Sequence, residues 1–183
     1  ITIDAGSHDI IQQTNTLALS AGYDIRLNAG TNIGSGTNSI ILNSGGNVYL
    51  DGENIYIDSP DSDLNIAQIT GESGTVNIKT SGASGSLTLN DDINAENITL
   101  SAINALNLNA NAQAGQNGIS LTGQSVNQAT DTTISAQNGT VSISASNGDI
   151  DLQGSVDNEN GNVVIVNSTS GNGNVTVNNV SAG

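Results

Sequence analysis

Carboxylate side chains are the groups in this sequence best suited to chemistry, because several of them lie close together along the chain. Paired Asp and Glu residues can cleave polysaccharides as general acid and base, and their oxygens can hold calcium. Residues two apart on a strand share a face, so Asp149 and Asp151 could flank one outer groove. The candidate clusters are Asp51/Glu53, Asp58/Asp61/Asp63, Asp91/Asp92 and Asp149/Asp151.

The partners that such carboxylates need for catalysis are scarce. A lyase groove requires a basic side chain, and the sequence has only two, Arg26 and Lys79, which lie far apart. A nucleophilic triad requires a base beside a Ser, and the only histidine, His8, lies in a Gly-Ser-His-Asp segment that is typical of a solvated loop. Zinc is implausible with no Cys and one His. We therefore expect no catalytic, cofactor-binding or metal-binding residue, and no enzyme.

Calcium at Asp58, Asp61 and Asp63 would suit the preference of this ion for hard oxygen ligands. The spacing lacks the EF-hand pattern, and the chain lacks the Gly-Gly-x-Gly-x-Asp repeat. The only proline, Pro60, lies within this segment, and Pro, Asp and Ser favour turns. We expect residues 58–63 to form a protruding corner that is made soluble by its acidic side chains.

The net charge of −15 limits the classes of partner. A nucleic-acid binder needs several Lys or Arg to neutralise phosphates, and anionic membrane surfaces repel an acidic chain. No apolar stretch approaches the roughly 18 residues that span a bilayer, so we expect no membrane insertion. Asn-x-Ser/Thr triplets, which arise by chance in an Asn-rich chain, begin at Asn97, Asn138, Asn167, Asn174 and Asn179.

Apolar residues recur in pairs two apart, which is the period of a strand and not of a helix. Turn-forming segments such as Asn147-Gly148 and Asn160-Gly161 separate them. The sequence has no Phe, Trp, Met or Cys, so the core must be narrow and filled by Ile, Val, Leu and Ala. Typical pairs are Ile55/Ile57, Val76/Ile78, Leu87/Leu89, Leu106/Leu108, Val141/Ile143 and Ile150/Leu152.

A longer period of about 22 residues decides the fold. The main column of apolar positions has steps of 22, 22, 21, 22, 21, 22 and 22, and comprises Ile11, Ile33, Ile55, Val76, Ile98, Ile119, Val141 and Val163. A looser second column runs through Ile3, Ile25, Val48, Ile69 and Ile93, and continues after a gap near Ala112, Ile134 and Val156. A third column runs through Leu17, Ile40, Leu64, Leu87, Leu106, Val126, Ile150 and Val175.

These columns predict a right-handed parallel β-helix with three short strands per coil and about eight coils, a rod near ~40 Å long. Residues 1–183 form one segment, in which the first two coils, about 1–45, are less regular because Gln13 and Ser35 occupy apolar positions. Two alternatives remain. Asn-Gly between alternating strands, as from Val141 to Leu152, also favours β-hairpins, and the Asn, Ser, Thr and Gly content favours disorder.

Segments 139–154 and 161–167 alternate short strands with Gly/Asn corners, and they resemble the repeat regions of filamentous-haemagglutinin-like exoproteins of two-partner secretion systems, including high-molecular-weight adhesins. The resemblance covers most of the chain as a pattern, and autotransporter passengers look similar. It implies a rod exported unfolded across the bacterial outer membrane, which folds outside and holds a tip away from the cell. Some family members are glycosylated at Asn sequons. The Asn-Pro-Asn motif of the secretion domain is missing, so the resemblance implies an internal segment.

The leading expectation for function is a structural or adhesive stalk in a secreted bacterial surface protein. Its partners would be host-cell or surface glycans and receptors, or other copies of itself. Two alternatives stay open: a self-assembling filament subunit, because the sequence shows no evident polar cap, and a carbohydrate-binding or polysaccharide-degrading β-helix, because of the outer carboxylates.

Overall fold

The computed structural model of the chain describes residues 1–14, 18–60, 62–168 and 173–183, and its regular structure in these ranges consists of β-strands without any helix. The strands are β1 Thr2–Asp4, β2 Leu19–Ala21, β3 Ile25–Asn28, β4 Asn32–Ile33, β5 Ile40–Ser44, β6 Asn47–Asp51, β7 Asn54–Pro60, β8 Leu64–Thr70, β9 Thr75–Ser81, β10 Leu87–Leu89, β11 Ile93–Ser101, β12 Ala105–Leu108, β13 Ala112–Gly123, β14 Ser125–Gln128, β15 Thr133–Ala136, β16 Thr140–Ala145, β17 Ile150–Asn158, β18 Asn162–Asn167 and β19 Val175–Ala182.

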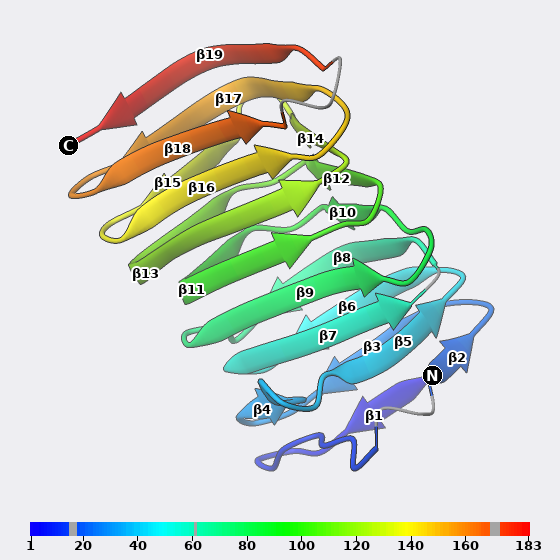
Figure 1. Ribbon diagram of the computed structural model, residues 1–183. Coiled ribbons are helices and arrows are strands. Elements are labelled where there is room, and N and C mark those ends of the chain that lie inside the picture. The colour runs from blue at the N-terminus through cyan, green and yellow to red at the C-terminus, as the bar shows by residue number, and fades with distance from the viewer. Residues whose placement is uncertain (15–17, 61, 169–172) are drawn as a thin grey trace.

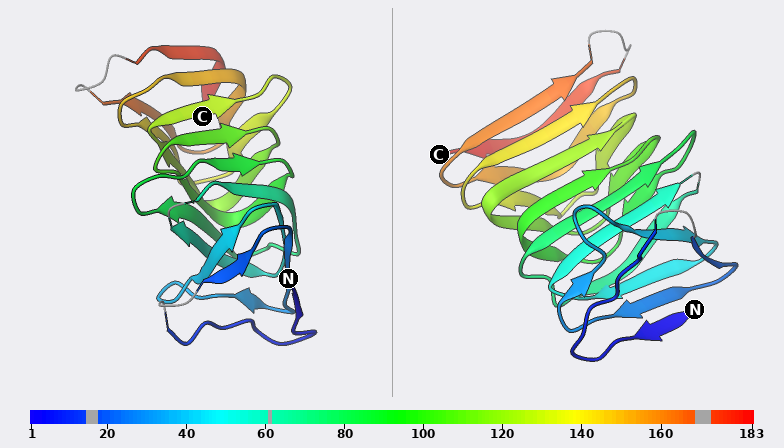
Figure 2. Two further views of the ribbon diagram at one scale, coloured as in Figure 1. Left: turned by 90° about the vertical axis from the view of Figure 1, so that its right-hand side faces the viewer. Right: turned by 60° about the horizontal axis from the view of Figure 1, so that its bottom comes forward.

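Each strand pairs with the equivalent strand of the next coil, and the pairings in the described ranges are parallel. In Figure 1 the near strands β7, β9, β11, β13, β16 and β18 run from left to right, and the chain returns on the far side while it rises toward the C-terminus, so the coil is right-handed. Figure 2 shows the N-terminal and C-terminal coils at opposite ends of this stack. The fold is therefore the predicted β-helix of stacked coils.

The coil has three faces, and some strands pass a corner from one face to the next. Face A holds β4, β7, β9, β16, β18 and the later parts of β11 and β13. Face B holds β10, β12, β14 and the early parts of β8, β17 and β19. Face C holds β1, β3, β6, β15, the late parts of β8, β17 and β19, and the early parts of β11 and β13.

The core lies along the axis between the three faces, because alternate residues of each strand point inward. In β7 the inward Ile55 and Ile57 are fully buried, whereas Tyr56 and Asp58 between them are partly exposed. The main column is confirmed by the pairing of Ile33, Ile55, Val76, Ile98, Ile119, Val141 and Val163 in register on face A. Stacked aliphatic ladders of this kind remove apolar surface from water in every coil.

The first member of the main column is corrected. Ile10, and not Ile11, bridges to Ile33, and Ile10 is 8% exposed whereas Ile11 is 62% exposed. The first coil is one residue longer than the later step predicts. A shift of one residue turns a side chain to the opposite face, so Ile11 points outward.

The third column is confirmed from Leu64 through Leu87, Leu106, Val126 and Ile150 to Val175. Its early part is wrong at Ile40, which pairs with Ile57 in the middle of β7. Leu17 lies outside the described residues. The pairing of Leu19 with Leu42 shows that β2 and β5 stack upon each other before face B takes its regular form.

The second column is confirmed where Ile25 pairs with Val48, and where Ile93, Ala112, Ile134 and Val156 follow one another. It is wrong at two steps: Ile3 pairs with Leu27 and not with Ile25, and Ile69 pairs with Leu50 and not with Val48. A register shift opposite Val48 and Tyr49 causes the second error, because Val48 faces Ile66 and the next residue, Tyr49, faces Gln68. The extra residue, Ala67, is a β-bulge.

The hairpin alternative is excluded between Val141 and Leu152, because β16 and β17 pair in parallel with strands of other coils. The expected protruding corner at 58–63 is also corrected in its first half. Asp58, Ser59 and Pro60 are the end of β7 and pair with Lys79, Thr80 and Ser81 of β9. A proline is tolerated there because it occupies the last position of the strand. Asp61 lies outside the described residues.

Candidate functional site

Four carboxylates of the predicted clusters accept backbone N–H groups from adjacent coils and lie beside corners of the coil: Asp63, Asp91, Asp92 and Asp149. The Oδ1 atom of Asp149 accepts from the N–H of Asn174 over 2.7 Å. The Oδ1 atom of Asp92 accepts from the N–H of Asn111 over 2.8 Å, and its Oδ2 atom accepts from the Asn111 Nδ2 over 3.0 Å. These carboxylates satisfy backbone donors that the corners leave without strand partners.

The same arrangement recurs at other acidic residues. Asp91 Oδ2 accepts from the N–H of Ile69 over 3.0 Å, and Asp63 Oδ1 accepts from the N–H of Ser86 over 2.8 Å. Glu96 Oε2 accepts from the N–H of Gln116 over 3.1 Å. Sequence reasoning missed this role. The signal that could have revealed it is an Asp, Asn or Glu that recurs beside successive strands at intervals of about one coil length.

Asparagine side chains extend the connections between coils. Asn65 donates from Nδ2 to Asn47 Oδ1 over 2.5 Å, Asn90 donates to Asn65 over 2.6 Å, and Asn109 donates to Asn90 over 2.9 Å. An amide both donates and accepts, so one side chain per coil makes a continuous ladder. The ladder gives these four asparagines a structural role between coils.

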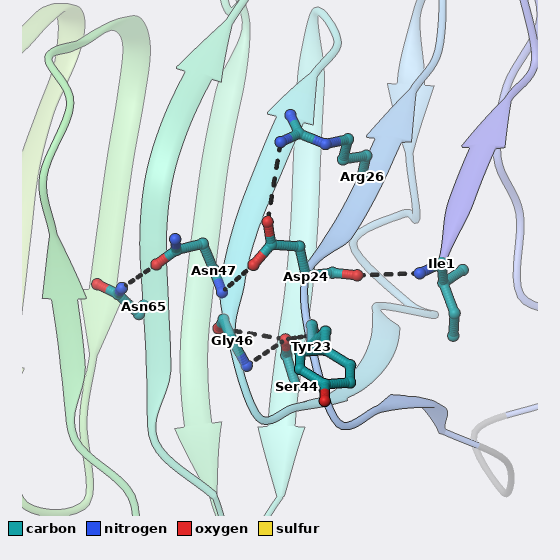
Figure 3. Close-up of polar contacts among 8 residues, drawn as sticks. All are labelled: Ile1, Tyr23, Asp24, Arg26, Ser44, Gly46, Asn47 and Asn65. Atoms are coloured by element: carbon teal, nitrogen blue, oxygen red, sulfur yellow. Dashed lines mark hydrogen bonds and ion pairs between the residues drawn. The ribbon is translucent and has the colours of Figure 1, made fainter.

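The Asp24 carboxylate in the early coils contacts both the backbone of the next coil and a cation (Figure 3). Its Oδ1 accepts from the N–H of Asn47 over 3.0 Å, and its Oδ2 lies 3.8 Å from Nη2 of Arg26. The Arg26 guanidinium lies over the ring of Tyr49, 3.5 Å from the ring centroid. Asp24 thus joins a contact between coils to a cation–π pair on the outer surface of face C.

An open groove of about 290 Å³ lies over this pair, across β1, β3, β6 and β8. Two rows of outward side chains line it, and each row is set by strand register. The first row is Thr2, Arg26, Tyr49 and Gln68, and the second is Asp4, Asn28, Asp51 and Thr70. Between the rows, Ile3, Leu27 and Leu50 form the floor. We call this site the Arg26–Tyr49 groove.

The bulge at Ala67 shapes this groove. Without the extra residue, the alternation of β8 would place a different side chain beside Tyr49. With it, Gln68 lies opposite Tyr49 and is exposed, and Ile69 turns inward to face Leu50. Bulges commonly redirect a side chain in this way.

The electrostatic surroundings of the groove are acidic. Burial raises the pKa of the half-buried Glu72 carboxyl, the N–H of Asn94 lowers it, and the nearby Asp91 and Asp51 raise it further. Hydrogen bonds from Thr31 and Asn32 lower the pKa of the exposed Asp9. The two carboxyls show opposite responses because Asp9 gains donors whereas Glu72 loses solvent.

The remaining predicted pairs do not form an acid–base site with a cation. Asp149 and Asp151 flank the buried Ile150 on the outer side, as predicted, but Asp149 holds the N–H of Asn174 and Asp151 accepts from Gln153. Lys79 Nζ lies 3.3 Å from Asp58 on face A. Of the pair Asp51/Glu53, only Asp51 lines the Arg26–Tyr49 groove.

No group of three His, Cys, Asp or Glu residues in the described ranges could hold a metal ion. Asp58 contacts Lys79 and Ser81, and Asp63 holds the N–H of Ser86, so these two carboxylates have separate partners. His8 is exposed in the loop after β1. The described residues include no helix that is long and apolar enough to cross a membrane.

The predicted sequons differ in exposure. Asn97 and Asn138 are partly buried, and Asn138 donates to Gln116 Oε1 over 3.2 Å. Asn167 donates to the carbonyl of Gly148, and its triplet extends to Thr169, outside the described residues. Asn174 and Asn179 are exposed on or beside β19.

Comparison with known protein families, with curated proteins and with solved structures finds no match for the chain.

Proposed function

We propose that the chain is a stalk segment of a secreted bacterial surface protein, an element that holds other parts of the protein away from the cell and catalyses no reaction. The observation that carries this proposal is that the carboxylates at the corners serve the stack itself. Those of Asp92 and Asp149, for example, hold backbone N–H groups of another coil. A polysaccharide-cleaving site would instead require two carboxylates without such partners, placed on either side of the substrate.

The construction of the coil suits a stalk. Successive coils repeat one set of contacts. Adding or removing a coil therefore changes the length by about 4.8 Å and requires no new kind of contact. The sequence has no Cys, and the core needs no disulfide. A chain of this kind can cross a membrane unfolded and fold outside, because each coil adds to the one before it. The resemblance to two-partner-secretion adhesins supports the same placement.

Removal of one whole coil tests the modular character that a stalk requires. Deleting residues 98–118 joins Asn97 to Ile119, which occupy successive positions of the face A register. We expect a folded rod that is shorter by about 4.8 Å in small-angle X-ray scattering. The control deletion of residues 98–108 removes face A and face B of one coil but leaves face C, and it should not fold. Failure of the 98–118 variant to fold would contradict the proposal.

Two further measurements address location and catalysis. Antibodies against the chain should label intact cells of the source organism, whereas labelling only after permeabilisation would contradict surface display.

Incubation with neutral and acidic polysaccharides, with and without calcium, should release no reducing ends. A release that is lost in the D149N/D151N variant would show a catalytic groove and overturn the proposal.

A further inference from the structure

We propose that the Arg26–Tyr49 groove binds a saccharide that carries free amino groups. The site lies on the outer surface of face C, in the first coils of the stack, and Figure 3 shows the position of Arg26 in it. This inference adds an adhesive contact to the proposed stalk and does not depend on it.

The two rows of the groove present both kinds of hydrogen-bonding group. Arg26 offers donors only, Asp4 and Asp51 offer acceptors only, and Asn28 and Gln68 offer both. Sugar hydroxyls donate and accept at once, so a polyhydroxy ligand can satisfy the whole set. The rows are about 6.7 Å apart and successive side chains in a row are about 4.8 Å apart, which is the scale of a sugar ring.

The stacked pair gives the groove a flat and ordered wall. The guanidinium of Arg26 is 3.5 Å from the Tyr49 ring centroid, and its Nη2 atom lies 3.8 Å from Asp24, so two contacts orient it. A planar group that is already held in place loses little conformational entropy when a ligand binds. The Arg26 side chain is 49% exposed, which leaves N–H groups directed to solvent.

Charge selects the amino group. The Arg26 guanidinium pairs with Asp24, whereas the Asp51 carboxylate has no cationic or hydrogen-bonding partner among the described residues. Asp4 accepts from Gly6 N–H and from Asn28, and no cationic side chain of the described ranges pairs with it. An ammonium group on the ligand would be attracted, and the carboxylate of a uronic acid would be repelled.

Isothermal titration at physiological salt tests the site with three trisaccharides, of glucosamine, of N-acetylglucosamine and of galacturonic acid. We expect the glucosamine trimer to bind, the acetylated trimer to bind at least fivefold more weakly, and the acidic trimer not to bind. Equal affinity for the first two trimers would overturn the requirement for an amino group. Bound trimer should also shift the NMR resonances of the Tyr49 ring.

A matched pair of variants separates the groove from the general negative charge of the chain. D51N should weaken binding roughly tenfold, because a charge-assisted contact is lost. D131N removes the same charge at a distant corner and should leave binding unchanged. If both variants weaken binding equally, the ligand is attracted non-specifically and the proposal is wrong. Deleting residues 98–118 spares the groove, so failure of the stalk and failure of this site are distinguishable.

Discussion

Asp24 accepts a hydrogen bond through Oδ1 from the backbone N–H of Asn47, 23 residues later and one coil along the axis, over 3.0 Å. The same relationship joins Asp9 to Asn32 and Asp92 to Asn111. A carboxylate that meets the first N–H of the following coil acts like a helix N-cap, because it satisfies a donor at the point where regular pairing begins. Part of the negative charge of the chain therefore comes from carboxylates that cap backbone N–H groups at the corners.

Asp92 provides the clearest test of this role, because both of its carboxylate oxygens bind Asn111. D92A should lower the free energy of unfolding by about 1 kcal/mol, the typical effect of losing a capping oxygen. D92N keeps an oxygen that can accept from the Asn111 N–H and should lose less than half of that. Urea unfolding of both variants measures the difference. Equal losses would show that charge and not the hydrogen bond is responsible.

The aliphatic ladder should be most sensitive at its centre. Ile98 is fully buried and pairs with Val76 and Ile119 on either side. I98A should cost about 3–4 kcal/mol, because a stacked side chain is removed and its neighbours on two coils lose contact. Val164 also lies on face A, but it points outward and is 42% exposed, so V164A should change stability by less than about 0.5 kcal/mol. Thermal unfolding followed by circular dichroism checks both.

The main ladder was predictable from sequence because an inward position is buried, and a polar side chain there would lose its hydrogen bonds to water. From Ile33 onward, buried aliphatic residues keep steps of 21 or 22 that correspond to paired positions. The first coils were not predictable in register. A one-residue insertion, such as the bulge at Ala67 or the longer first coil before Ile33, leaves the composition unchanged and moves the pairing.

The outer surface was less predictable than the core. Asp149 and Asp151 were correctly placed on one outer face, but sequence spacing did not reveal that Asp149 holds Asn174, 25 residues away. Similarly, Arg26 and Tyr49 are 23 residues apart and meet only because one coil separates them. Once the coil length is known, a search for polar residues spaced by about one coil finds both contacts.

Glu72 should make the stability of the fold depend on pH. Its pKa is raised by burial and by Asp91 and Asp51, so the folded state binds a proton more readily than the unfolded state. Its contribution is therefore fully present below the ordinary value of 4.5 and is lost as pH rises through the higher folded pKa. E72Q removes the charge and keeps an oxygen for the N–H of Asn94.

We expect E72Q and the parent chain to be equally stable near pH 4, and E72Q to be more stable at pH 7. The gain should be less than about 1 kcal/mol, because the group is partly exposed and solvent screens the repulsion. Urea unfolding across this range measures it. A variant that is less stable than the parent at pH 7 would show that the carboxylate is favourable, contrary to the geometry.

Close approach between coils should make one glycine irreplaceable at the corner where face C turns into face A. Gly118 has a φ of +86°, and a Cβ atom there would lie 2.4 Å from the carbonyl oxygen of Thr140 in the next coil. Both the backbone angle and the contact oppose a side chain, and the carbonyl is held in the strand ladder of β16. G118A should lower the free energy of unfolding by about 2–4 kcal/mol.

Gly22 provides the matched control, because a Cβ atom there meets nothing within 4 Å and its φ lies outside the left-handed region. G22A should be neutral or slightly stabilising, since alanine restricts the unfolded chain. Comparable losses in the two variants would mean that the backbone at this corner relaxes freely, and that the close approach of Gly118 to Thr140 does not exclude a side chain.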